Sequence, residues 1–308
     1  MVPVCDCISA QAADEYSYDL RPFEELRQNC TALRNVFIPE EQWNDYKNFC
    51  SPGQDEAQHQ PIMWLAYRGG YLCKFTGPIH EFILEGKPET NTVTKQYKKD
   101  LIERWFSKKE FLERYKASRI FEGRLAELRF ASWLRQTGWQ ISCLEAYGGE
   151  FDVEAQNPEG VQTVFEVKYL ATEESRFHLG VQALNNGAGC GSLSLYSPLD
   201  YLLCRTYEAA RKLDGADATR IVVLILGEYS AFDLQLKDGW INWDKPRLFR
   251  RDQDIQPFLD KFFQQYPDFE KDMGSRFKSL QQIWILQDTR DVGLERKYCI
   301  DPTTGVSS

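Results

Sequence analysis

The sequence predicts a mixed α/β fold in which one helix precedes three strands and a second helix precedes a fourth strand. Three observations support this order. Apolar side chains recur at helical spacing over residues 119–136. Residues 151–155 and 164–169 alternate in polarity on either side of a turn, as the strands of a hairpin do. Residues 199–213 are then typical of a helix, and the apolar run 221–226 is typical of a buried strand. We expect the four strands to form one mixed sheet.

The first helix is predicted to pack on the sheet and to bring one acidic side chain with it. Its apolar residues form a single face: Ile120, Leu125, Leu128, Ala131, Trp133 and Leu134. Gly138 ends the helix, and residues 139–144 follow at once as the first strand. Glu127 therefore lies near the middle of a helix that packs on the strands of the hairpin.

The two hairpin strands carry charged side chains on one face. Because side chains alternate across a strand, Asp152 falls on one face of the first strand, and Glu166 and Lys168 share one face of the second. Two carboxylates and an amine on a rigid hairpin can bind a hard divalent cation and position a water beside it. The alternative is an exposed hairpin whose outer face happens to be charged. Glu154 shares the Asp152 face, either as a solvated neighbour or as an extra ligand.

The turn between these strands determines whether the two carboxylates meet. If residues 158–160 form a three-residue loop, with Pro158 first and Gly160 in the left-handed region, Asn157 pairs with Val161. The two carboxylates then lie directly opposite one another. A two-residue loop would shift the pairing by one position and turn every side chain to the other face. The composition of the loop favours the longer turn.

These residues resemble the motifs of the PD-(D/E)XK nuclease superfamily, which has the restriction-endonuclease-like fold. The resemblance is carried by three short motifs: Gly123-x-x-x-Glu127, Gly149-Glu150-Phe151-Asp152 and Glu166-Val167-Lys168. It extends over about residues 118–228, where the later helix and apolar strand fit the remaining core helix and the fourth strand of the family. Phe151 stands at the position of the proline that names the family.

The resemblance implies a role for each residue of the motifs. Asp152 and Glu166 would bind Mg²⁺ or Mn²⁺, with the main-chain carbonyl of Val167 as a further ligand. Lys168 would orient the attacking water and offset charge on the pentacovalent phosphate, and Glu127 would help to hold the metal or the lysine. These roles agree with the general chemistry of Mg²⁺, which favours one or two carboxylates and retains several waters.

The function that follows is a metal-dependent nuclease, with DNA favoured over RNA as the substrate. Gln182 follows the third strand and is a further candidate for the catalytic site. The main alternative is a catalytically inactive chain that retains the fold as a nucleic-acid-binding or protein-interaction module. A structural or sensor protein with incidental charges on its hairpin is a more distant alternative.

The charge of the chain is unevenly distributed, which bears on nucleic-acid binding. The formal net charge is −9, yet the segment 95–119 holds nine basic residues against four acidic ones. Such a segment could follow the phosphate backbone. The lysines that we assign to this contact are Lys95, Lys98, Lys99, Lys108 and Lys109. The alternative is an amphipathic helix with a solvated basic face.

Composition suggests a soluble cytoplasmic protein with two domains. We expect an accessory domain over residues 1–94, the nuclease domain over residues 95–290 and a C-terminal tail over residues 291–308. The chain has no apolar run long enough to span a membrane, and its nine cysteines are an odd number, which favours reduced thiols. No membrane partner is expected, and a homodimer is compatible with the sequence.

Overall fold

A computed structural model describes residues 92–102, 111–170, 197–226, 243, 245–248, 256–289 and 293–304, with a few single positions before residue 83. The chain divides into two compact units between Leu128 and Arg129, within one continuous helix. All the strands described lie in the second unit. The expected accessory domain, residues 1–94, falls almost wholly outside the described residues.

The second unit is built on a six-stranded mixed sheet, so the predicted mixed α/β class is confirmed. The strands are β1 (Gln140–Leu144), β2 (Val153–Gln156), β3 (Gln162–Leu170), β4 (Thr219–Leu226), β5 (Gln282–Thr289) and β6 (Gly293–Ile300). They lie side by side in sequence order. Strands β1, β2 and β3 are antiparallel, β3, β4 and β5 are parallel, and β6 returns antiparallel to β5.

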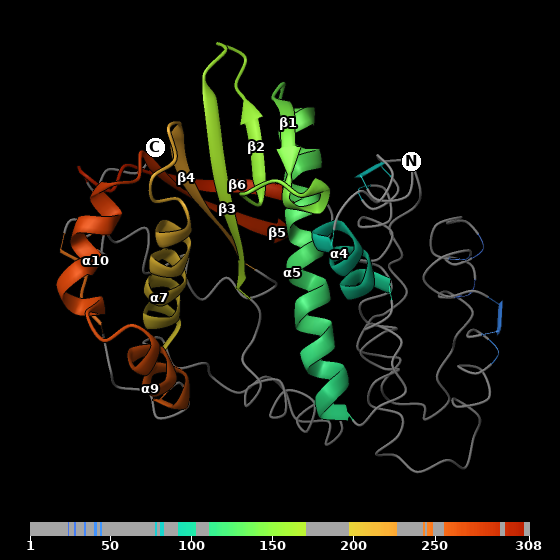
Figure 1. The fold of residues 1–308 in the computed structure, drawn as a ribbon, viewed down its shortest axis with the longest axis horizontal. Helices are drawn as coiled ribbons and strands as arrows, with labels where there is room; N and C mark the ends of the chain where they lie inside the picture. Colours follow the sequence, from blue (N-terminus) through green and yellow to red (C-terminus); the bar gives the residue numbers. More distant parts are fainter. Residues whose placement is uncertain are drawn as a thin grey trace. The chain divides into compact units, whose positions relative to one another are not determined.

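Helices complete the predicted order and supply the crossovers between parallel strands. They are α4 (Thr92–Ile102), α5 (Phe111–Gln136), the 3-10 helix η4 (Glu145–Tyr147), α7 (Ser197–Lys212), α9 (Gln256–Gln265) and α10 (Phe269–Lys278). Helix α7 joins β3 to β4, and α9 and α10 lie between β4 and β5 in the chain (Figure 1). A parallel pair needs such a crossover, because a tight turn joins only antiparallel strands.

The sheet has a different helical cover on each face. On one face, Phe130 of α5 packs edge-on against Phe165 of β3 and Trp284 of β5, with ring centroids 5.2 and 6.3 Å apart. On the other face, alternate strand residues such as Val222 and Ile283 pack in one cluster with α7, α9 and α10. Strand β4 is buried from Ile221 to Leu226, which explains its uninterrupted apolar sequence.

The predicted register of the hairpin is confirmed. Val153 pairs with Phe165, and the Asn157 N–H donates to the Val161 carbonyl at 3.1 Å. Gly160 has a φ of +87°, the left-handed conformation expected at the third loop position. Continuing the ladder by one residue brings Asp152 opposite Glu166. The turn therefore sets the position of both carboxylates.

Two strands near the C-terminus were not expected. Strand β6 lies within residues 291–308, the expected tail, and pairs with β5 along its length. Its middle is the charged run Glu295-Arg296-Lys297, where the pairing with β5 shifts register, so Tyr298 and Ile300 face one side of the sheet and Leu294 faces the other. All three of these side chains are buried. A charged edge strand is common in proteins because it discourages pairing with other chains.

Two features bear on the expectations for the whole chain. None of the helices in the part that the structure describes is long and apolar enough to cross a membrane. Within the same part, Cys143, Cys204 and Cys299 form no disulfide.

Replacing Gly160 tests how strongly the turn fixes the hairpin. A Cβ at this position would meet only the Gln156 side-chain nitrogen, at 3.8 Å, so the effect is conformational and not steric. We expect Gly160→Val to lower the free energy of unfolding by about 1–2 kcal/mol, because a β-branched residue is strained at positive φ. Gly160→Asn should lose less, because asparagine tolerates this region. Urea unfolding of both variants measures the difference, and equal losses would contradict the assigned turn.

Candidate functional site

Glu166 is a buried carboxylate at the centre of the candidate site. It lies on β3 and its side chain has no solvent exposure. Its Oε1 atom accepts hydrogen bonds from the Lys168 Nζ at 2.7 Å and lies 2.6 Å from the Lys212 Nζ. Its Oε2 atom is also buried and has no hydrogen-bond partner among the described residues. A buried oxygen without a hydrogen-bond partner is still available to bind a ligand.

Asp152 is held beside Glu166 by the backbone of β3. It directly precedes β2, so the facing Val167 N–H has no strand partner on that side and donates to Asp152 Oδ2 at 2.8 Å. The second carboxylate oxygen, Oδ1, lies 3.7 Å from the Lys212 Nζ. Since the N–H and C=O of one strand residue point to the same side, the Val167 carbonyl is also directed toward Asp152.

The two lysines reach Glu166 from different elements. Lys168 lies on β3 two residues after Glu166, on the same face, and its side chain is 22% exposed. Lys212 is the last residue of α7, and its side chain is 55% exposed. Burial alone would lower the pKa of Lys212, but the nearby carboxylates, Asp152 first, then Glu166 and Glu145, raise it above its usual value. The Lys212 amine is therefore a cation.

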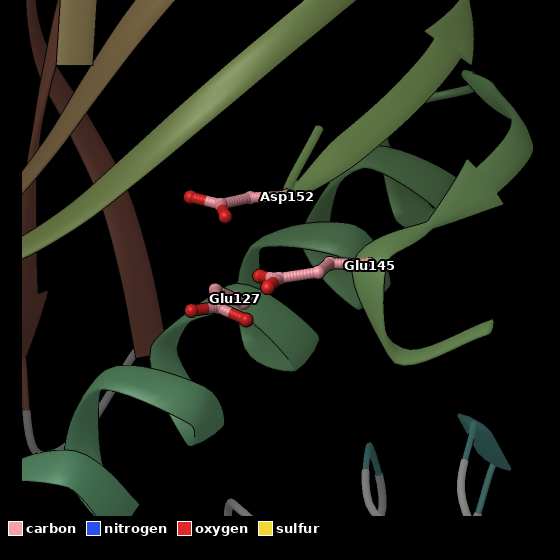
Figure 2. A group of neighbouring side chains, drawn as sticks. All are labelled: Glu127, Glu145 and Asp152. Carbon is pink, nitrogen blue, oxygen red and sulfur yellow. The ribbon is translucent and has the colours of Figure 1, made fainter. Parts of the chain in front are cut away.

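A second group of carboxylates adjoins Asp152. Oxygen atoms of Glu127, Glu145 and Asp152 lie within 4.8 Å of one another. Figure 2 shows the three side chains converging from α5, from the segment after β1 and from the segment before β2. Glu127 is further held by the Tyr97 hydroxyl, which donates to it at 2.8 Å, and by Arg124 at 3.3 Å. Oxygen-rich groups of this kind suit hard divalent cations.

The loop between β1 and β2 brings Glu145 to Asp152. Strand β1 has a bulge between Ile141 and Cys143, after which Leu144 pairs with Val153. Without the extra residue, Glu145 would face Phe151. With it, the Glu145 N–H donates to the Asp152 carbonyl at 3.2 Å. The loop then closes through Gly149, whose N–H donates to the Leu144 carbonyl at 2.9 Å.

The structure brings some of the predicted site residues together and leaves others outside its described part. Asp152, Glu166, Val167 and Lys168 form one patch, and Glu127 lies near Asp152. Glu154 is half-buried on β2 and is not a member of the carboxylate group. The predicted residues outside the described part are Gln182, Lys108 and Lys109. Lys95 and Lys99 are exposed on α4, and the side chain of Lys98, on the same helix, is not described.

Lys212 and Glu145 belong to the site but were not predicted from the sequence. Lys212 ends α7, where a basic residue is ordinarily explained by the helix dipole. Its place in the site depends on how α7 returns across the sheet, which local sequence patterns do not determine. Glu145 follows β1 directly, so pairing β1 with β2 would have placed it near Asp152. The bulge that gives the final register has no sequence signal that we recognise.

Three carboxylates in the second unit face two ammonium groups. The carboxylates belong to Glu145, Asp152 and Glu166, and the ammonium groups to Lys168 and Lys212. One buried oxygen of Glu166 has no hydrogen-bond partner among the described residues. The site can therefore accept a further cation bound through oxygen atoms. Comparison with protein-family models, with curated proteins and with solved structures gives no match for this chain.

Replacing Gly149 tests whether the tight loop is needed. A Cβ here would lie 2.9 Å from the Leu144 carbonyl oxygen and 2.9 Å from the Cys143 Sγ, so the backbone must shift. We expect Gly149→Ala to reduce the free energy of unfolding by about 1–3 kcal/mol. Gly123→Ala is the matched control, because nothing lies within 4 Å of its added Cβ. It should stabilise α5 by up to about 1 kcal/mol. Chemical unfolding of the two variants should therefore shift in opposite directions.

Proposed function

We propose that this chain is a metal-dependent nuclease that hydrolyses phosphodiester bonds, with DNA favoured over RNA, on a restriction-endonuclease-like core. The observation that supports it most is the patch formed by Asp152, Glu166 and Lys168. A carboxylate pair and an amine meet there on one hairpin, and Glu166 keeps one buried oxygen without a partner. The order of α5, β1, β2, β3, α7 and β4 also agrees with the family's core.

The residues fit a hard divalent cation. Glu166 Oε2, the carboxylate of Asp152 and the Val167 carbonyl would hold Mg²⁺ or Mn²⁺, with Glu127 and Glu145 as further oxygen donors near Asp152. Such an ion would lower the pKa of water and offset negative charge on the phosphate. The donor set contains oxygen alone, which disfavours zinc.

Lys168 would position the attacking water and stabilise the developing negative charge. Lys168 keeps its ammonium group 2.7 Å from Glu166 and partly open to solvent, where it could orient a water toward phosphorus. That water oxygen would form the new P–O bond as the bond to the leaving sugar oxygen breaks. The water loses one proton and the leaving oxygen gains one. The positive charge of Lys168 would offset the charge that builds on the phosphate oxygens.

A specific observation favours the alternative, a catalytically inactive binding module. Lys212 and Lys168 together already pair with the carboxylates of Glu166 and Asp152. An ion-pair cluster of this kind can be purely structural. Metal-dependent cleavage separates the two functions, because a structural cluster has no need of a divalent ion.

The catalytic assignment predicts a loss of cleavage with little loss of fold. We expect Asp152→Ala and Lys168→Ala to reduce cleavage of labelled plasmid, single-stranded DNA or RNA by at least about 100-fold, while substrate binding survives better. Activity should require Mg²⁺ or Mn²⁺ and stop with EDTA. The controls are Asp217→Ala and Lys271→Ala, which remove the same charges from exposed positions.

Three outcomes would contradict the proposal. Equal cleavage by the wild type and Asp152→Ala would assign the activity to another site or to a contaminant. Cleavage that persists in EDTA would exclude the metal. Binding of nucleic acid with no cleavage under any metal condition would favour the inactive module.

The assignment of the basic segment predicts a change in salt dependence. Lys95 and Lys99 are exposed on α4. If both contact phosphates, the Lys95→Ala/Lys99→Ala variant should bind every sequence more weakly, with a slope of log affinity against log salt that is shallower by about two. Lys261→Ala/Lys271→Ala removes the same charge from α9 and α10 and is the control. An unchanged slope in the first variant would assign α4 a solvated basic face.

A further inference from the structure

We propose that Lys212 is an exchangeable internal counter-ion, which neutralises Asp152 and Glu166 when no metal is bound and leaves them when a divalent cation binds. The inference rests on the metal site of the proposed function and concerns how that site is regulated. Lys212 belongs neither to the hairpin nor to its motif.

The Lys212 ammonium group lies close to both carboxylates of the proposed metal site. It lies 2.6 Å from Glu166 Oε1 and 3.7 Å from Asp152 Oδ1, so one positive charge bridges the two carboxylates. A divalent cation held by Glu166 Oε2 and Asp152 would lie close to this ammonium group, and the two cations would repel one another. Metal binding therefore weakens the Lys212 ion pairs, and the Lys212 ion pairs weaken metal binding.

The charge that Lys212 supplies can be replaced by a metal ion. Lys212 pairs with Glu166 and lies near Asp152, and both of these carboxylates are buried. Without a metal this positive charge is needed, because buried carboxylates without a nearby cation are costly. A divalent ion bound to the same two carboxylates supplies two positive charges where Lys212 supplied one, so Lys212 is no longer needed there.

Solvent exposure identifies Lys212 as the lysine that leaves. Its side chain is 55% exposed at the end of α7, whereas that of Lys168 is 22% exposed and starts from the middle of the sheet. The flexible four-carbon stem allows the Lys212 ammonium group to move into water without burying a charge. Lys168 is less exposed, at 22%, and stays beside Glu166.

The test is Mn²⁺ binding without nucleic acid, measured by electron paramagnetic resonance on the full chain. Lys212→Met and Lys212→Gln remove the competing charge, so each should bind Mn²⁺ about tenfold more tightly than the wild type. Lys212→Arg keeps the charge and should bind Mn²⁺ nearly as the wild type does. Lys271→Met is the control for a lost surface lysine and should also leave the affinity unchanged.

Thermal unfolding supplies a second measurement. Without metal, Lys212→Met should unfold at a lower temperature than the wild type, because Asp152 and Glu166 lose a counter-ion. Saturating Mn²⁺ should close this difference, since the ion replaces the lost charge and also stabilises by binding the folded state. A difference of the same size with and without Mn²⁺ would assign Lys212 a purely structural role and overturn the inference.

The outcomes also separate this inference from the nuclease proposal. Unchanged Mn²⁺ affinity in Lys212→Met and Lys212→Gln, with binding lost in Glu166→Gln, overturns the counter-ion role and leaves the metal site standing. Tighter Mn²⁺ binding without cleavage of any substrate supports the counter-ion role and counts against the nuclease. Absence of Mn²⁺ binding in the wild type and in both neutral variants overturns both.

Discussion

The arrangement of the site depends on one constraint, the neutralisation of the fully buried Glu166 carboxylate. A charge without solvent contact is tolerated only when cations and hydrogen-bond donors surround it. Glu166 obtains its cations from two separate elements, Lys168 on β3 and Lys212 at the end of α7. The crossover helix therefore has an electrostatic role as well as a packing role. It joins two parallel strands and ends where its last residue can reach the carboxylate.

The positions of the other two carboxylates, Asp152 and Glu145, are fixed by a turn and a bulge of the backbone and not by long side chains. The turn at Gly160 sets the register that brings Asp152 opposite Glu166, and the bulge in β1 brings Glu145 to Asp152. Asp152 is then locked by the Val167 N–H. Rigid placement of this kind suits a site that must hold charged oxygens close together, because it prevents them from moving apart to relieve their repulsion.

The parts that follow local rules could be predicted from the sequence. The helix before Gly138, the three-residue loop and the facing of Asp152 and Glu166 all follow from periodicity and turn chemistry. The position of Lys212 could not, because it depends on how α7 crosses the sheet. The position of Glu145 depends on the bulge in β1, and the buried side chains of β6 change face where its pairing with β5 shifts register, within the charged run Glu295-Arg296-Lys297. The mixed α/β class was therefore predictable, whereas contacts between distant segments required the structure.

A site that supplies its own counter-ions faces a conflict between stability and function. If both lysines were as enclosed as Lys168, the ion pairs would be permanent and the carboxylates would have little capacity for a metal. If neither were present, the folded chain would depend on a metal to neutralise Glu166. The chain combines one enclosed and one exposed lysine at the same carboxylate oxygen. A purely structural cluster has no evident need of this asymmetry, because two enclosed ion pairs would neutralise Glu166 equally well. The exposure of Lys212 is therefore better explained by its replacement by a divalent cation than by the stability of the fold alone.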